Sequence, residues 1–163
     1  MSQLKSVIAA MAPRSVQGRA PLLNVPGDTV PFNAIPGEAI IVRVRSRDVA
    51  GRYCVLESIA EPLTSPPLHY HREDEIFHIL DGTVSFLCGG RSFDAGPGAV
   101  VVVPAGVHHS WANLTDASTR MMITFTPGGI DELLAEMEGL SIDAMAERSA
   151  RYGSFIVGTP LVP

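Results

Sequence analysis

Two segments carry most of the information in this sequence: HYHREDEIFHILDG at residues 69–82 and GAVVVVPAGVHHSWAN at residues 98–113. All five histidines of the chain lie within them. His69 and His71 are two positions apart, so an extended strand would direct both imidazoles to the same face. The carboxylate of Glu75 follows after a short polar stretch that can turn. The first segment therefore offers three metal-binding groups from one part of the chain.

The second segment supplies a further imidazole, His109, just after a Pro-x-Gly turn. Three imidazoles and one carboxylate are donors that suit a divalent transition metal, and they leave coordination positions for other ligands. We therefore predict a metal site made by His69, His71, Glu75 and His109.

Strand periodicity predicts which neighbours share the face of these ligands. Residues two or four positions along a strand from Glu75 or His109 point the same way as the ligand. The substrate pocket predicted on this basis is lined by Phe77, Ile79 and Trp111. His78 and His108 have the opposite parity, so we expect them to pack elsewhere or to face solvent.

The two segments together resemble the cupin double motif, G-x5-H-x-H-x3-4-E-x6-G followed by G-x5-P-x-G-x2-H-x3-N. The residues that match the two halves are His69, His71, Glu75 and Gly82, then Gly98, Pro104, Gly106, His109 and Asn113. The sequence departs from the motif at Leu63, where the first half begins with glycine. This difference affects the loop before His69 and changes no ligand.

The resemblance extends to small cupins of the quercetin-dioxygenase-like kind and implies a metal-dependent dioxygenase. The substrate would be a phenolic or enolic compound, flavonol-like or diketone-like. The four predicted ligands would hold one divalent transition metal per chain, with iron, nickel, manganese, copper and zinc as the candidates. Glu75 would be the catalytic residue, a ligand that also accepts the substrate hydroxyl proton as general base. The pocket residues would exclude water and stack on a flat ring.

Short runs of branched and aromatic residues recur with turn signals between them. The expected strands are residues 40–45, 52–59, 75–80, 83–87, 91–93, 100–103, 108–112 and 119–126. Short strands at this spacing indicate a β-sandwich or barrel. The resemblance selects an all-β double-stranded β-helix, the jelly roll or cupin barrel, with C-terminal helices. We divide the chain into an extended N-terminal arm at 1–37, the barrel at 38–127, and C-terminal helices and tail packing on the barrel at 128–163.

The C-terminal part changes to helical spacing. An apolar stripe with helical periodicity is formed by Ile130, Leu133, Leu134 and Met137. Gly139 is suited to end that helix, and Ser141 to cap a second helix that ends at Gly153. Residues 155–157 could form a final strand. We interpret the apolar stripes as faces that pack on the barrel.

Composition narrows the classes of partner. Of the 163 residues 46% are hydrophobic and 18% charged, and the net charge of −5 comes without a basic stripe, so we expect no nucleic-acid partner. The longest apolar runs are too short to span a bilayer, and we reject a signal peptide at residues 1–12. Cys54 and Cys88 lack metal or redox spacing, so we expect a cytoplasmic protein with free thiols. Strands that are apolar on both faces, such as 100–103, predict a homodimer.

Three function classes remain open. The first is a dioxygenase that uses dioxygen to oxidise the small-molecule substrate. The second is a metal-dependent isomerase, epimerase or lyase, which would turn over without oxygen. The third is a non-catalytic protein that binds a small molecule and releases it unchanged.

Overall fold

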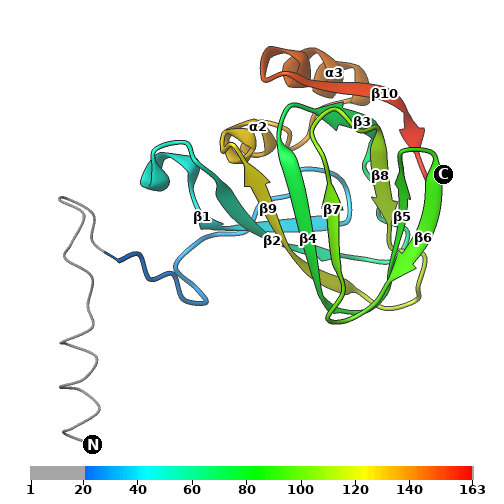
Figure 1. The fold of residues 1–163 in the computed structure, drawn as a ribbon, viewed down its shortest axis with the longest axis horizontal. Coiled ribbons are helices and arrows are strands. Elements are labelled where there is room, and N and C mark those ends of the chain that lie inside the picture. The colour runs from blue at the N-terminus through cyan, green and yellow to red at the C-terminus, as the bar shows by residue number, and fades with distance from the viewer. Residues whose placement is uncertain (1–20, 163) are drawn as a thin grey trace, which may run out of the picture.

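Two five-stranded antiparallel sheets make up the fold in the computed structural model, which describes residues 21–162 (Figure 1). The first sheet has the order β1 (Glu38–Val44), β2 (Cys54–Ala60), β9 (Thr119–Thr126), β4 (Asp74–Asp81) and β7 (Val100–Val103). The second has the order β10 (Ser154–Pro160), β3 (Pro67–His71), β8 (His109–Ala112), β5 (Val84–Cys88) and β6 (Arg91–Ala95). Strands distant in sequence are neighbours in both sheets, and the predicted jelly-roll barrel is confirmed.

The barrel interior is filled by alternate residues of the strands. In β9, Met121, Ile123 and Phe125 are buried, whereas the residues between them are more accessible. Phe77 of β4 meets Phe86 of β5 edge to face, with ring centroids 5.1 Å apart. The period of two therefore directs one face of each strand inward, and aromatic packing joins the two sheets.

The turn between β4 and β5 depends on Gly82. Its φ is +74°, in the left-handed region that costs glycine little. A Cβ added there would lie 2.7 Å from Cγ2 of Thr119, the first residue of β9. Both the backbone conformation and the close neighbour therefore require glycine at this position.

Two α-helices follow the barrel strands, α2 (Ile130–Ala135) and α3 (Ile142–Arg151), and a 3-10 helix, η1 (Ser46–Val49), follows β1. The predicted cap is confirmed, because the Ala144 N–H donates to Oγ of Ser141 over 3.3 Å. In Figure 1 both α-helices lie at the upper end of the barrel. No helix of residues 21–162 has the length and apolar character needed to cross a membrane.

A buried polar contact fixes α2 to η1. The carboxylate of Asp131 accepts hydrogen bonds from the hydroxyl and, over 3.2 Å, from the N–H of Ser46. The Ser46 oxygen in turn accepts from the Gly129 N–H over 2.7 Å. All groups of this contact are satisfied, so it holds the start of α2 in a single position.

The chain ends add to both sheets. The expected final strand is present as β10, which pairs with β3, so the C-terminal region supplies a strand as well as two helices. Part of the predicted N-terminal arm is described, and its Phe32 forms an isolated bridge with Ile40 of β1. The first 20 residues of the arm lie outside the described residues.

Candidate metal centre

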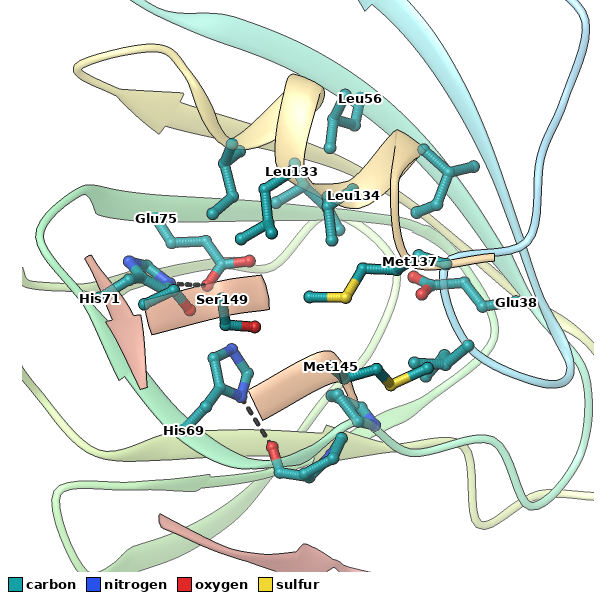
Figure 2. A pocket seen from close by; sticks show the side chains of 18 of the residues that line it. Glu38, Leu56, His69, His71, Glu75, Leu133, Leu134, Met137, Met145 and Ser149 are labelled. Atoms are coloured by element: carbon teal, nitrogen blue, oxygen red, sulfur yellow. Dashed lines mark hydrogen bonds and ion pairs between the residues drawn. The ribbon is translucent and has the colours of Figure 1, made fainter. Parts of the chain in front are cut away.

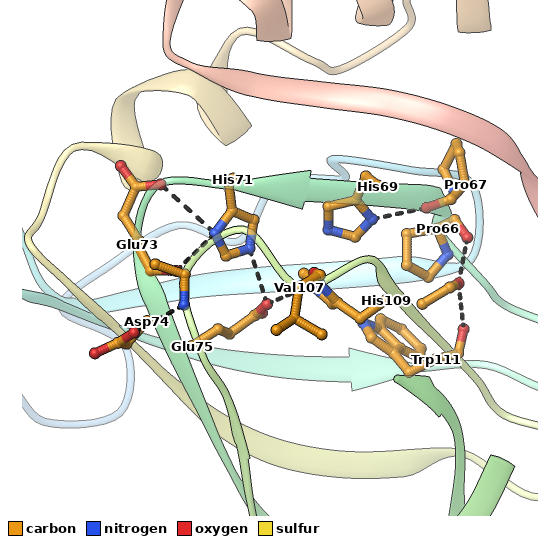
Figure 3. A network of polar contacts seen from close by, with 12 residues as sticks. Pro66, Pro67, His69, His71, Glu73, Asp74, Glu75, Val107, His109 and Trp111 are labelled. Atoms are coloured by element: carbon orange, nitrogen blue, oxygen red, sulfur yellow. Dashed lines mark hydrogen bonds and ion pairs between the residues drawn. The ribbon is translucent and has the colours of Figure 1, made fainter. Parts of the chain in front are cut away.

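Four side chains from three strands converge at one point inside the barrel. His69 and His71 come from β3, Glu75 from β4 and His109 from β8, and the four ligand atoms all lie within 4.8 Å of one another (Figure 3). His69 and His109 are direct partners across the β3–β8 pair. Glu75 reaches the group from the opposite sheet. The structure thus brings together the four residues whose sequence spacing predicted a metal site.

The local chain path explains how His109 reaches this group. Gly106, in the turn before β8, has a φ of +77°. Its N–H donates to the backbone oxygen of His71 over 2.7 Å. This bond ties the turn before β8 to the end of β3, so the strands that carry the histidines are held together next to the site.

Backbone carbonyls orient all three imidazoles. Nδ1 of His69 lies 2.7 Å from the Pro67 oxygen, and Nδ1 of His109 lies 2.9 Å from the Val107 oxygen. Nδ1 of His71 lies 3.0 Å from the backbone oxygen of Glu73. Because a carbonyl only accepts, each Nδ1 carries the proton, and Nε2 remains for a metal. This is the orientation that metal-ligating histidines usually adopt.

The spacing of the donor atoms fits a metal ion. Oε2 of Glu75 lies 3.1 Å from Nε2 of His71 and 2.9 Å from Nε2 of His109. Adjacent ligands about 2.1 Å from an octahedral metal lie about 3.0 Å from each other. Without a metal these two contacts require an additional proton on each ring. A bound cation would take the place of those protons, so the residues present fit a divalent metal.

The electrostatics favour the metal-binding forms of Glu75 and His69. Burial acts to raise the pKa of Glu75, but hydrogen bonds from His109 and His71 outweigh it and lower the pKa to about 2. Burial lowers the pKa of His69 to about 4, with the charge of His109 acting in the same direction. Burial also acts to lower the pKa of His71, but the bond to Glu75 prevails and raises it. At neutral pH Glu75 is therefore ionised and His69 neutral, as ligands must be.

A second carboxylate supports His71 from behind. Glu73 is 1% exposed, and its Oε2 lies 3.6 Å from Nδ1 of His71 without a hydrogen-bond partner among the described residues. Its Oε1 accepts from Nε of Arg72 over 3.0 Å. A carboxylate in this position stabilises positive charge on the ring it faces.

An apolar cavity opens beside the four ligands. Its empty space, counted together with its opening to solvent, is about 760 Å³, and both sheets and both α-helices line it (Figure 2). Met145 of α3 and Met137, which follows α2, are labelled in Figure 2 and line this space. The helix predicted to continue to Gly139 ends at Ala135, so Met137 reaches the cavity from the connecting segment. The helices predicted to pack on the barrel therefore form part of the cavity.

The predicted pocket residues divide into two groups. Trp111 lines the cavity, as expected. Phe77 and Ile79 are fully buried in the core and do not line it, which corrects their assignment as pocket residues. Strand parity gives the face of the sheet but not the depth, and these residues lie beyond Glu75 along β4. His78 and His108 are exposed, as their parity indicated.

Sequence reasoning missed three polar residues of the cavity, Glu38, Ser149 and Ser154. Glu38 begins β1 and shares the inward parity of Ile40 and Val42, so alternation could have placed it on the inner face of the strand, although not at the cavity. Ser149 lies on α3 four residues after Met145, so helical periodicity places both on the face that packs on the barrel, although it does not show that this face lines a cavity. Figure 2 shows its side chain near His69.

Comparison with known proteins gives one family match and many similar structures. The family model described as "Cupin domain" matches residues 57–125. An uncharacterised protein of Streptomyces coelicolor is 30% identical over 57 residues, which cover 35% of this chain and 53% of that protein. The match thus spans about half the length of this curated relative.

The solved structures support the fold alone, because their sequence identities are low. KdgF from Halomonas sp. superposes with a TM-score of 0.61 and 15% identity, over 69% of this chain and 99% of that one. The polyketide cyclase RemF from Streptomyces resistomycificus has a TM-score of 0.60 and 17% identity, over 81% and 94%. A predicted oxalate decarboxylase from Thermotoga maritima has a TM-score of 0.59 and 18% identity, over 65% and 99%.

Proposed function

This chain belongs to the cupin superfamily, and we propose that it is a metal-dependent dioxygenase acting on a phenolic or enolic small molecule, such as a flavonol or a 1,3-diketone. One observation carries the proposal. Three imidazole Nε2 atoms and a Glu75 oxygen converge beside an apolar cavity. Four protein ligands leave about two positions of an octahedral metal for other molecules.

The metal would be held by His69, His71, Glu75 and His109. When bound, a divalent transition metal would act as a Lewis acid toward an enolic or phenolic oxygen and as a template that positions dioxygen beside it. The metal itself is iron, nickel, manganese, copper or zinc in this proposal. All of them accept imidazole and carboxylate donors.

Glu75 is the residue placed to move a proton. Its Oε2 is engaged with the two histidines, whereas its Oε1 has no hydrogen-bond partner within residues 21–162. Glu75 lines the cavity, and its low pKa keeps it ionised at neutral pH. We propose that Oε1 accepts the proton of the substrate hydroxyl. Trp111 and the apolar residues of the helices would exclude water around a flat ring.

Oxygen uptake tests this proposal. The metal-loaded protein would be incubated in air with a panel of flavonols and 1,3-diketones, and oxygen consumption and product masses would be followed. We expect stoichiometric oxygen consumption with at least one member of the panel. Turnover in the absence of oxygen would instead indicate an isomerase, epimerase or lyase. Ligand binding without any product would indicate a binding protein.

We also propose that the protein is a homodimer. The outer face of β4 and β7 carries Ile76, Leu80, Val100 and Val102, and both valines are more than half exposed. An apolar sheet face of this kind is suited to a second copy of the chain. Val102→Lys should weaken the dimer tenfold or more in sedimentation, since it places a charge in the interface. Leu114, which is as exposed as Val102 at 57%, provides a matched control, and an equal effect of Leu114→Lys would contradict the proposed face.

A further inference from the structure

A second buried glutamate lines the same cavity. Glu38 is the first residue of β1, and its side chain is 6% exposed. Figure 2 shows it across the pocket from His71 and Glu75, with Met137 between them in the view. The cavity therefore has ionisable groups at two separate places, the candidate metal ligands and Glu38, within a predominantly apolar lining.

One oxygen of Glu38 is already used by the protein. Oε1 accepts a hydrogen bond from the hydroxyl of Ser58, on the neighbouring strand β2, over 2.6 Å. Oε2 has no hydrogen-bond partner within residues 21–162, and it is accessible to solvent. This oxygen is therefore open to the cavity. A buried carboxyl with an unused oxygen is costly unless another group pairs with it.

The electrostatic setting suits a group that can both donate and accept. Burial raises the pKa of Glu38 to about 7; the bond from Ser58 opposes the rise, and the negative charge of Glu75 adds to it. A carboxyl that is partly protonated at neutral pH can donate to a ligand oxygen or accept from a ligand hydroxyl. The surrounding apolar wall strengthens such a bond because it lowers the local dielectric constant.

We propose that Glu38 is a specificity-determining residue that hydrogen-bonds a hydroxyl group of the ligand, at the end of the ligand away from the metal centre. This inference rests on the proposed function, since it takes the other end of the ligand to be held at the four metal ligands. It restricts the substrate class to elongated molecules with an apolar body, chelating oxygens at one end and a hydroxyl at the other. Flavonols with a hydroxylated outer ring meet this description.

Paired probes test the proposal through binding rather than turnover. The probes are 3-hydroxyflavone and 3,4′-dihydroxyflavone, which differ by one hydroxyl on the outer ring, and their affinities for the Zn²⁺-loaded protein would be measured without oxygen. Wild type should prefer the dihydroxy probe by about tenfold, the value of one buried hydrogen bond. Glu38→Leu should abolish the preference, and Glu38→Gln, which retains a donor and an acceptor, should keep part of it.

Ser58→Ala is the matched control, because it removes the bond inside the protein and leaves Oε2 of Glu38 in place. It should keep the preference for the dihydroxy probe. If Glu38→Leu does not fold, Glu38→Met has a similar length without a hydrogen-bonding group and carries the same test.

An unchanged preference in the apolar variant would overturn the proposal, and so would equal affinities in wild type or no binding of either probe. Oxygen uptake is measured separately, so a protein that binds the probes selectively but consumes no oxygen would contradict the proposed function and leave the role of Glu38 intact.

Discussion

Glu75 and Glu38 line the same cavity and are almost equally buried, yet their pKa values are shifted in opposite directions. Glu75 lies within 3.1 Å of two imidazole nitrogens, and its pKa is lowered to about 2. Glu38 receives one hydroxyl hydrogen bond, from Ser58, and its pKa is raised to about 7. Burial acts to raise the pKa of both, so the difference comes from the neighbours.

The two glutamates show how one apolar cavity can hold two different polar functions. A carboxylate that stays ionised suits cation binding. A carboxyl that is protonated near neutrality suits recognition of a neutral hydroxyl. Exchanging either residue for glutamine should therefore have a different consequence at each end of the cavity.

The largest effect is expected from Glu75→Gln. The amide keeps an oxygen donor of similar shape but removes the basic carboxylate, so turnover should fall by about two to four orders of magnitude while metal binding weakens without disappearing. Oxygen uptake and metal content of the same sample measure the two effects. Exposed Glu61 provides a control for the same exchange outside the cavity. Equal oxygen consumption by wild type and Glu75→Gln would remove Glu75 from the mechanism.

Glu38→Gln should change how stability depends on pH. The pKa of Glu38 is higher in the folded chain than the ordinary 4.5, so the folded state binds the proton more tightly than the unfolded state. The free energy of unfolding should fall as pH rises from about 4.5 to about 7, by about 2–3 kcal/mol from this group.

Glutamine does not titrate, so the free energy of unfolding of the Glu38→Gln variant should lack the part of the fall with pH that Glu38 causes. Urea unfolding of both metal-free proteins at about pH 5 and about pH 8 gives the comparison, and groups common to both cancel in the difference. Equal pH slopes in the two proteins would contradict the assignment.

Ser58→Ala should have the smallest effect. It removes the hydroxyl that donates to Glu38, at a cost of about 1 kcal/mol in the free energy of unfolding. The pKa of Glu38 should rise further, because that hydrogen bond lowers it. The upper end of the pH-dependent decline should therefore move to higher pH. Ser85, whose hydroxyl donates to Asp94 at the surface, gives a control exchange that should leave this upper end unchanged. If the free energy of unfolding of Ser58→Ala falls over the same pH range as that of wild type, Ser58 does not influence the pKa of Glu38.

The sequence predicted the four converging side chains of the candidate metal centre, because most of their signals are short-range. His69 and His71 follow from a period of two, and the turn at Gly106 precedes the third histidine. The jelly roll followed from strand lengths and turns together with the cupin resemblance. The two C-terminal helices followed from an apolar stripe and a serine cap.

The cavity could not be predicted in the same way, because its walls are joined only by tertiary packing. Met145 reaches the cavity because α3 folds back over it, and Met137 does so from the segment that connects α2 to α3. Glu38 has inward parity, but no local pattern shows that its strand lies on the cavity wall. Phe77 has the correct parity and lies too deep. The homodimer stays a prediction, since the structure contains one chain and shows no contact of the outer face of β4 and β7 with a second copy.

Metal content tests the central claim most directly. Wild type and the double variant His69→Ala, His71→Ala would be loaded with the same divalent metal, desalted and analysed by elemental analysis, with circular dichroism to establish folding. If the four side chains form the site, wild type should retain about one metal ion per chain, and the folded double variant should retain almost none, because two of the four donors are lost. Equal metal content in two folded proteins would contradict the site.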